Sequence, residues 1–234
     1  MTDVKQISIK HSDESKPNAG RSILLISEIY SSIQGESTYA GRPCTFIRLT
    51  GCPLRCRWCD SAFAYNGGQR LTHEVILKRV QSLGQRLVEV TGGEPLAQSG
   101  CPELLHSLCD SGHEVLLETS GTMDLEPVDP RVIKIVDVKC PSSGESDKNR
   151  WDQLPMLNPA DELKFVVADR ADYLWARQAL IDNALQGGHV IHFSPVQGEL
   201  DPALLAGWII EDHLDVRLHL QLHKIIWPDS TFGV

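Results

Sequence analysis

The sequence predicts an α/β protein whose parallel sheet curves into an incomplete β/α barrel. Short apolar runs alternate with amphipathic stretches along the chain, as expected for strands joined by crossover helices. The seven expected strands outnumber the four expected helices, so the barrel should not close into eight strand–helix units. Ligands of such sheets bind outside the carboxyl ends of the strands, and the functional residues are expected there.

The expected strands are apolar runs that stop at Gly, Pro, Ser or Thr: Thr45–Leu49, Leu87–Val90, Val115–Glu118, Ile133–Val138, Leu163–Val167, Val190–Phe193 and Arg217–Leu222. The expected helices are Thr72–Leu83, Pro102–Ser111, Ala171–Asn183 and Pro202–His213. Thr72 is a plausible N-cap for the first helix, and Asp201 before Pro202 is a typical helix start. Asn149–Asp161 and the stretch before it, PSSGESDKN, are expected to be a long connection within one domain.

Composition indicates an ordinary water-soluble chain, with 41% hydrophobic and 23% charged residues among 234. A net charge of -9 argues against a broad basic face for nucleic acid or for an anionic membrane. No apolar run is long enough to cross a bilayer, and the polar N-terminus lacks the apolar centre of a signal peptide, so we expect no export signal. We expect residues 1–21 to be a disordered tail and residues 22–234 to form a single domain.

Three of the seven cysteines form a C-x3-C-x2-C loop directly after an expected strand. Without an export signal the chain is expected in a reducing cytoplasm, where clustered cysteines indicate metal binding or catalysis sooner than disulfides. Cys52, Cys56 and Cys59 could hold three irons of a 4Fe–4S cluster and leave the fourth iron to a ligand with an amine and a carboxylate. The alternative is a closed zinc site with Cys44 as its fourth ligand.

Several short motifs now give the chain a resemblance to a known family. The cysteine loop and Thr91-Gly92-Gly93-Glu94-Pro95 resemble the radical S-adenosylmethionine (SAM) superfamily. The segment Ser32-Ile33-Gln34-Gly35-Glu36 and the terminal His223-Lys224 ahead of Pro228 resemble, more specifically, the 7-carboxy-7-deazaguanine synthase (QueE) family. The resemblance runs from about Glu28 to Pro228 and implies the partial radical-SAM barrel with a parallel sheet.

The resemblance also implies roles for individual residues. The three cysteines of the loop would bind the 4Fe–4S cluster, and Ser61, where threonine is usual, would bind Mg²⁺. The substrate would contact Ile33, Gln34, Gly35, Glu36, Arg48, Thr91 and Pro228. S-adenosylmethionine would contact Trp58, Cys59, Asp60, Gly93, Glu118, Asp137, Val138, Lys139, Ser194, Pro195, Val196 and Gln197.

Several residues of these motifs also have an ordinary structural interpretation. Gly92 and Gly93 could form a simple turn, and Arg48 could belong to an internal salt bridge. Ser61 could cap the helix that follows the cysteine loop. The role of Pro228 stays open, because some relatives end at the matching proline whereas this chain continues to Val234.

The function implied by the resemblance is a carbon–nitrogen lyase of queuosine biosynthesis. It would use a SAM-derived radical to convert 6-carboxy-5,6,7,8-tetrahydropterin into 7-carboxy-7-deazaguanine, with loss of ammonia and regeneration of SAM. The family further implies a homodimer and an electron donor such as flavodoxin, with no direct nucleic-acid partner. The rival interpretations are an activating enzyme with an open face for a protein substrate, and a zinc-binding module without catalytic activity.

Overall fold

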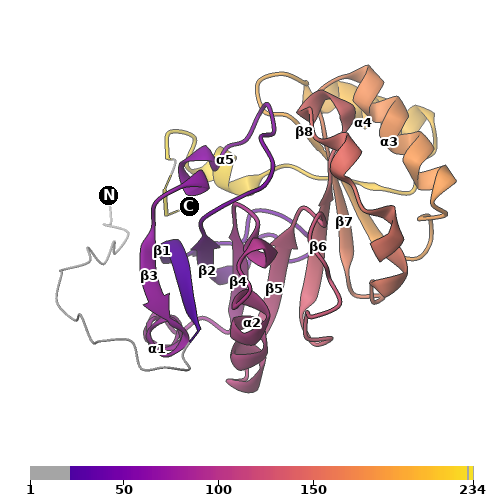
Figure 1. Ribbon diagram of the computed structural model, residues 1–234. Coiled ribbons are helices and arrows are strands. Elements are labelled where there is room, and N and C mark those ends of the chain that lie inside the picture. The colour runs from indigo at the N-terminus through magenta and orange to yellow at the C-terminus, as the bar shows by residue number, and fades with distance from the viewer. Residues whose placement is uncertain (1–21, 231, 234) are drawn as a thin grey trace.

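The computed structural model describes residues 22–230 and 232–233, and these residues share one nine-stranded sheet (Figure 1). The strand order is β3-β1-β2-β4-β5-β6-β7-β8-β9. The strands are β1 Ile23–Ile33, β2 Pro43–Leu49, β3 Gln69–Thr72, β4 Leu87–Gly92, β5 Glu114–Thr119, β6 Ile133–Val138, β7 Glu162–Val167, β8 Val190–Pro195 and β9 Arg217–Leu218. The expected tail at residues 1–21 lies outside the described residues.

The sheet confirms the predicted α/β partial barrel. All seven expected strands are present as β2 and β4 to β9, and these seven pair with one another in parallel. The sheet does not close, because β3 and β9 are its two edges. Two strands were not predicted: β1 runs antiparallel to β2 and to β3 at one edge. Polar residues interrupt β1 at Ser27, Glu28, Ser31 and Ser32, so it lacks a clear alternating pattern.

The helices are α1 His73–Leu83, α2 Cys101–Asp110, α3 Arg170–Asp182, α4 Pro202–Glu211 and a short α5 Leu222–Ile226. The first four were predicted to within a few residues, whereas α5 replaces the end of the expected last strand. Thr72 caps α1 by accepting a hydrogen bond from the amide of Val75, and Asp201 caps α4 through the amide of Ala203. The expected long connection forms three short 3-10 turns, Pro141–Ser143, Ser146–Lys148 and Trp151–Met156.

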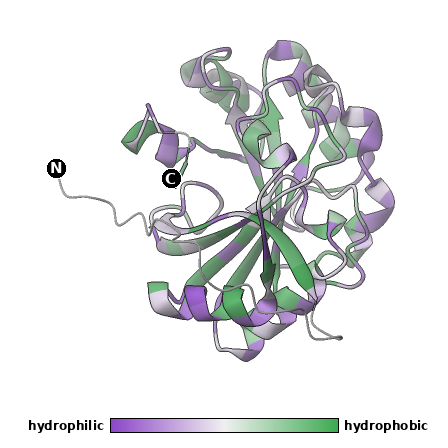
Figure 2. Ribbon diagram, turned by 60° about the vertical axis from the view of Figure 1, so that its left-hand side comes forward, coloured by the Kyte–Doolittle hydropathy of each residue, from purple (hydrophilic) through white to green (hydrophobic). Residues whose placement is uncertain are grey.

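The two faces of the sheet differ in chemistry. Val88 and Val90 of β4 join the main hydrophobic core, which also contains residues of α1 to α4. Their neighbours Glu89 and Thr91 point to the opposite, inner face because successive strand side chains alternate. Figure 2 shows hydrophobic strands inside the molecule and hydrophilic residues along the outer helices.

The inner face is itself divided along the strands. Its amino end is closed by a small apolar cluster, Cys44, Phe46, Leu87, Leu116 and Ile135. Its carboxyl end carries the polar residues and opens into the functional cavity. None of the helices in the described part of the chain has the length and apolar character needed to cross a bilayer.

Candidate active site

A cavity of about 490 Å³ lies at the carboxyl ends of the parallel strands, as the fold class predicts. The cysteine loop follows β2, the Thr91–Gly93 turn follows β4, and Glu118 and Asp137 are on β5 and β6. The C-terminal segment around α5 lines the remaining side of the cavity. Six carboxylates and four lysine or arginine side chains line it, so the cavity favours ligands that carry positive charge.

The three cysteines of the loop share this cavity and are partly exposed to it. The loop is anchored by backbone hydrogen bonds from Gly51 to Ala64 (2.8 Å) and from Arg57 to Ser143 (3.0 Å). Burial raises the pKa of the Cys56 thiol to about 11, so this thiol stays protonated until a metal displaces the proton. The three thiols therefore fit a cluster that takes one thiolate at each of three irons.

Cys44 cannot complete a zinc site with this loop. It lies at the amino end of β2 and is fully buried, paired in register with Leu87. The loop begins beyond Leu49, five residues further along the strand, which is roughly 16 Å at 3.3 Å per residue. Zinc ligands must lie about 2.3 Å from one metal ion. Among the residues that the structure describes, no three His, Cys, Asp or Glu side chains are placed to hold a single ion.

Gly92 and Gly93 are required by close packing between two strands. A Cβ atom on Gly92 would lie 2.1 Å from the carbonyl oxygen of Leu49, and one on Gly93 would lie 2.2 Å from that of Gly51. Gly92 also has a φ of 136°, which a residue with a side chain rarely adopts. The pair therefore seats the turn after β4 directly against the start of the cysteine loop. The amide of Glu94 completes this contact by donating to the carbonyl of Gly51 at 2.8 Å.

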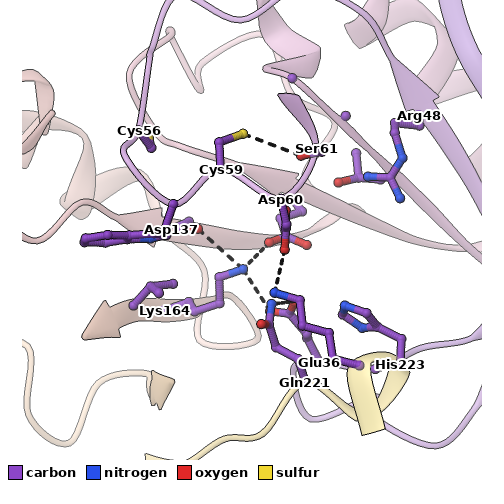
Figure 3. A pocket seen from close by; sticks show the side chains of 18 of the residues that line it. Glu36, Arg48, Cys56, Cys59, Asp60, Ser61, Asp137, Lys164, Gln221 and His223 are labelled. Carbon is purple, nitrogen blue, oxygen red and sulfur yellow. Dashed lines mark hydrogen bonds and ion pairs between the residues drawn. The ribbon is translucent and has the colours of Figure 1, made fainter. Parts of the chain in front are cut away.

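Lys164 of β7 is the centre of the charged network in the cavity (Figure 3). Its ammonium lies 2.9 Å from Glu36 and 3.4 Å from Asp137, and it also contacts Glu118. Burial opposes the charge on Lys164, but the carboxylates outweigh it and raise the pKa of this lysine well above its usual range.

The carboxylates around Lys164 do not share its charge equally. Burial opposes ionisation of Glu36, but Lys164 outweighs it and holds the pKa of Glu36 well below its usual range. Burial raises the pKa of Glu118 in spite of the same lysine. Asp137 has a second cation, Lys139, at 3.0 Å. One lysine thus compensates its neighbours unevenly, which leaves the Glu118 side of the cavity ready for a cation or a hydrogen-bond donor.

Two segments from opposite ends of the chain meet over this network. The carbonyl of Gly35 accepts a hydrogen bond from the amide of Leu222 (3.0 Å), and Gln221 donates to Glu36 (2.6 Å). A Cβ atom on Gly35 would lie 2.3 Å from the His223 ring, so only glycine leaves room for that histidine. Lys224 pairs with Asp60 of the cysteine loop at 2.8 Å, which brings all three motifs together.

Comparison with known proteins shows which family the chain belongs to. A model of the Radical SAM superfamily matches residues 46–137. A protein of Koribacter versatilis called 7-carboxy-7-deazaguanine synthase is 47% identical over 224 residues, which cover 89% of this chain and 99% of the relative. A protein of the same name from Chlorobaculum tepidum is 49% identical over 214 residues, which cover 90% of this chain and 97% of the relative. The chain belongs to the 7-carboxy-7-deazaguanine synthase family.

A solved structure supports the fold of this synthase family member. The crystal structure of QueE from Escherichia coli superimposes with a TM-score of 0.72 over 85% of this chain and 94% of that one, at 24% identity. Membership of the radical SAM superfamily implies a 4Fe–4S cluster and SAM as cofactors. The cavity at the cysteine loop is where both would bind in this chain.

The cavity brings together most of the residues expected from the sequence. Lining it are Ile33, Gln34, Gly35, Glu36, Arg48, Cys52, Cys56, Trp58, Cys59, Asp60, Ser61, Thr91, Gly93, Glu118, Asp137, Lys139, Val196, Gln197 and Pro228. Three expected SAM contacts, Val138, Ser194 and Pro195, do not line it. Val138 faces the hydrophobic core instead, and Ser194 is buried with a hydroxyl that has no hydrogen-bond partner among the described residues.

The structure also addresses the ordinary interpretations of Arg48 and Ser61. Arg48 forms an internal ion pair with Glu28 (2.7 Å) and a hydrogen bond to Tyr30 (2.7 Å), and it lines the cavity as well. Ser61 directly precedes a 3-10 helix, Ala62–Tyr65, but its side chain makes no capping hydrogen bond. Its hydroxyl lies 3.9 Å from the sulfur of Cys59 instead.

Sequence reasoning gave no site role to several polar residues that line the cavity, among them Glu89, Lys164 and Gln221. Glu89 and Lys164 interrupt apolar strands, which is the same signal that drew attention to Arg48. Gln221 begins the Gln221–Lys224 segment that contributes to the resemblance, but it was expected to belong to the last strand and received no site role.

Proposed function

We propose that the chain is a 7-carboxy-7-deazaguanine synthase that converts 6-carboxy-5,6,7,8-tetrahydropterin into 7-carboxy-7-deazaguanine with loss of ammonia. The observation that carries this proposal is the meeting of Gln34–Glu36 and His223–Lys224 at the cysteine loop. These are the two motifs most specific to the synthases. Together with full-length similarity to proteins of that name, they favour the synthase over other radical SAM activities.

In this proposal Cys52, Cys56 and Cys59 bind the 4Fe–4S cluster, and the amine and carboxylate of SAM complete it. When bound, the cluster and SAM supply the one-electron chemistry that starts the reaction. The chain's own residues position SAM. Asp60, Glu118 and Asp137 surround the part of the cavity beside the cysteine loop, and their negative charge suits the sulfonium cation of SAM.

The remaining wall of the cavity binds the pterin and excludes water. Arg48 presents a guanidinium to anionic ligands, and its position is fixed by Glu28 and Tyr30. The C-terminal segment covers the cavity through Gln221, His223, Trp227 and Pro228. A protein substrate would need an open face at this point, so the cover favours a small substrate over the activating-enzyme alternative.

Ser61 is the proposed protein ligand of Mg²⁺, which would hold the substrate carboxylate. Its hydroxyl is free of a capping role and lines the cavity beside Cys59. Mg²⁺ prefers oxygen ligands and keeps several waters, so one hydroxyl can suffice. Ser61→Ala should weaken the Mg²⁺ dependence of turnover and leave the visible spectrum of the cluster unchanged. Turnover with an unaltered Mg²⁺ dependence would remove this role from Ser61.

The deciding experiment is anaerobic reconstitution with iron and sulfide, followed by incubation with SAM, a chemical reductant and the tetrahydropterin. Mass spectrometry should then detect 7-carboxy-7-deazaguanine. Cys56→Ala should give neither cluster nor product, whereas Cys109→Ser, on the outer helix α2, should give both. A reconstituted cluster that cleaves SAM but yields no deazapurine would assign the chain to another radical SAM activity.

The proposal includes an electron donor of the flavodoxin type and a homodimer, which rest on the family, and a cytoplasmic location, which is the expectation from the sequence. Flavodoxin should replace the chemical reductant in the assay. Light scattering on the reconstituted protein should give twice the mass of 26.0 kDa. A stable monomer with full activity would contradict the dimer.

A further inference from the structure

Glu89 is a buried carboxyl group on the floor of the cavity. It lies on the inner face of β4, two residues before Thr91, and is 2% exposed. Phe46 and Leu116 are its register partners on the two neighbouring strands, so apolar side chains flank it. A carboxyl group in such surroundings loses the hydration of its charged form and needs protein or ligand partners in return.

The other five carboxylates that line the cavity each have a cation. Glu36, Glu118 and Asp137 share Lys164, Asp60 pairs with Lys224, and Glu199 pairs with Arg57. Within the described part of the chain, Glu89 forms no ion pair and accepts a hydrogen bond only from the side-chain amide of Gln34. Burial, reinforced by Glu118 and Glu36, raises the pKa of Glu89 well above its usual range. The carboxylate form is therefore costly until a ligand supplies hydrogen-bond donors.

Hydrogen bonds fix the orientation of the Gln34 side chain beside Glu89, and the strand register shows which cavity residues lie next to Glu89. The side-chain oxygen of Gln34 accepts a hydrogen bond from the amide of Glu36 at 2.9 Å, so its nitrogen must face Glu89. Arg48 and Thr91, a register pair, lie at the carboxyl side of Glu89 on the same face. Glu89 thus lies among the residues proposed to contact the pterin, in the middle of β4 and further from the cysteine loop than Thr91.

We propose that Glu89 is a specificity-determining residue whose carboxylate accepts hydrogen bonds from the ring N3–H and the 2-amino group of the pterin. This inference rests on the proposed synthase function. A 2-amino-4-oxopteridine presents these two donors side by side, and their spacing matches the two oxygens of a carboxylate. A carboxylate without a cation discriminates well here, because an analogue lacking the amino group leaves a buried oxygen unpaired.

The test compares two ligands that differ only at position 2. The reconstituted protein, saturated with SAM, would be titrated with 6-carboxypterin or with 6-carboxylumazine, and binding would be followed by fluorescence. In 6-carboxylumazine a carbonyl replaces the amino group. The wild type should bind the pterin about ten- to hundredfold more tightly, the range expected for a hydrogen bond to a charged group. Equal binding of the two ligands by the wild type would overturn the inference without any variant.

Glu89→Gln separates recognition of the ligand from support of Gln34. The new amide oxygen can still accept from Gln34, but the side chain no longer offers two acceptors to the ligand. The variant should bind the pterin about tenfold less tightly and lose most of the preference for the amino group. An unchanged preference in a variant with a normal cluster spectrum would show that Glu89 only supports Gln34, and would overturn the inference.

A matched control is Glu114→Gln, the same substitution on neighbouring β5. Glu114 pairs with Arg42 at 2.6 Å and does not line the cavity. This variant should keep the wild-type preference. The two proposals fail differently: a wild type that makes the deazapurine without discriminating at position 2 refutes only the role of Glu89. A wild type that makes no deazapurine and binds neither ligand refutes the synthase assignment and this inference together.

Discussion

Two lysines are buried on neighbouring strands of the sheet, and only one of them belongs to the active site. Lys134 of β6 pairs with Asp161 at 2.8 Å, and both side chains are almost fully buried. Asp161 also accepts hydrogen bonds from the amides of Lys134 (2.8 Å) and Asn158 (2.7 Å). Lys164 of β7 faces the cavity instead, where Glu36, Glu118 and Asp137 share its charge.

The difference lies in how charge is balanced. Asp161 and Lys134 form a closed pair, one charge against one, with the carboxylate oxygens occupied by donors from the chain. Around Lys164 the carboxylates outnumber the cation, and the excess negative charge faces the cavity. A buried ion is therefore a poor guide to function by itself. An excess of negative or positive charge beside a cavity is a better guide to function, because a bound ligand must balance that excess.

The strongest test of this comparison is Lys164→Met, which removes the cation and leaves its carboxylates together. Unpaired buried charges should lower the free energy of unfolding by about 3–5 kcal/mol. Deazapurine formation by the remaining folded protein should fall below detection, because the network no longer holds Glu36 and Glu118 in place. Urea denaturation and product mass analysis measure the two effects. Near-normal turnover would mean that the network is only structural.

Lys134→Met should lower the free energy of unfolding by a similar amount, about 3–5 kcal/mol, without changing the cavity. Turnover per folded molecule should stay within about twofold of the wild type, since Lys134 lies on the opposite face of the sheet from the cavity residues. Denaturation monitored by circular dichroism gives the first quantity, and an assay at low temperature gives the second.

A double variant sharpens the result for Lys134. Lys134→Met with Asp161→Leu replaces the whole closed pair by apolar groups and should restore part of the lost stability. The lost hydrogen bonds to the amides of Lys134 and Asn158 should cost about 1 kcal/mol each. If the double variant were no more stable than Lys134→Met, the pair would not be the closed unit described here.

Glu118→Gln should have a smaller effect, because the amide oxygen can still accept a hydrogen bond from Lys164. Removing one negative charge makes the cavity less suited to a cation, and we expect SAM affinity to fall about tenfold. Equilibrium binding of SAM to the reconstituted protein measures this. Binding as tight as in the wild type would show that Glu118 does not contribute its charge to that site.

The smallest effect concerns pH. Folding lowers the pKa of Glu36 below its usual value of 4.5, because Lys164 outweighs the burial of the carboxylate. Its stabilising contribution is complete above pH 4.5 and is lost as the pH falls through the lower pKa of the folded state. In the apoprotein, Glu36→Gln should therefore reduce the loss of stability between pH 5 and pH 3. Parallel stability curves for the two proteins would contradict the lowered pKa.

The sequence predicted the fold correctly where a local run of apolar residues corresponds to a buried strand. The parallel strands, such as Leu87–Gly92 and Ile133–Val138, are apolar runs that stay buried on at least one face. Strand β1 escaped prediction because its polar residues are stabilised by pairing with β2 and β3 at the sheet edge. Strand pairing of this kind joins residues far apart in sequence and leaves little local signal.

The amino-acid sequence by itself determined where the thiols lie and which strand ends carry the site. Cys52, Cys56 and Cys59 are contiguous on one loop, so their spacing alone is informative. Only the tertiary structure decided how the buried charges are shared: Arg48 with Glu28, Lys164 with three carboxylates, and Glu89 with no cation among the described residues. These partners come from parts of the chain that are far apart in sequence, and the free energy of a buried charge depends on neighbours that no local pattern specifies.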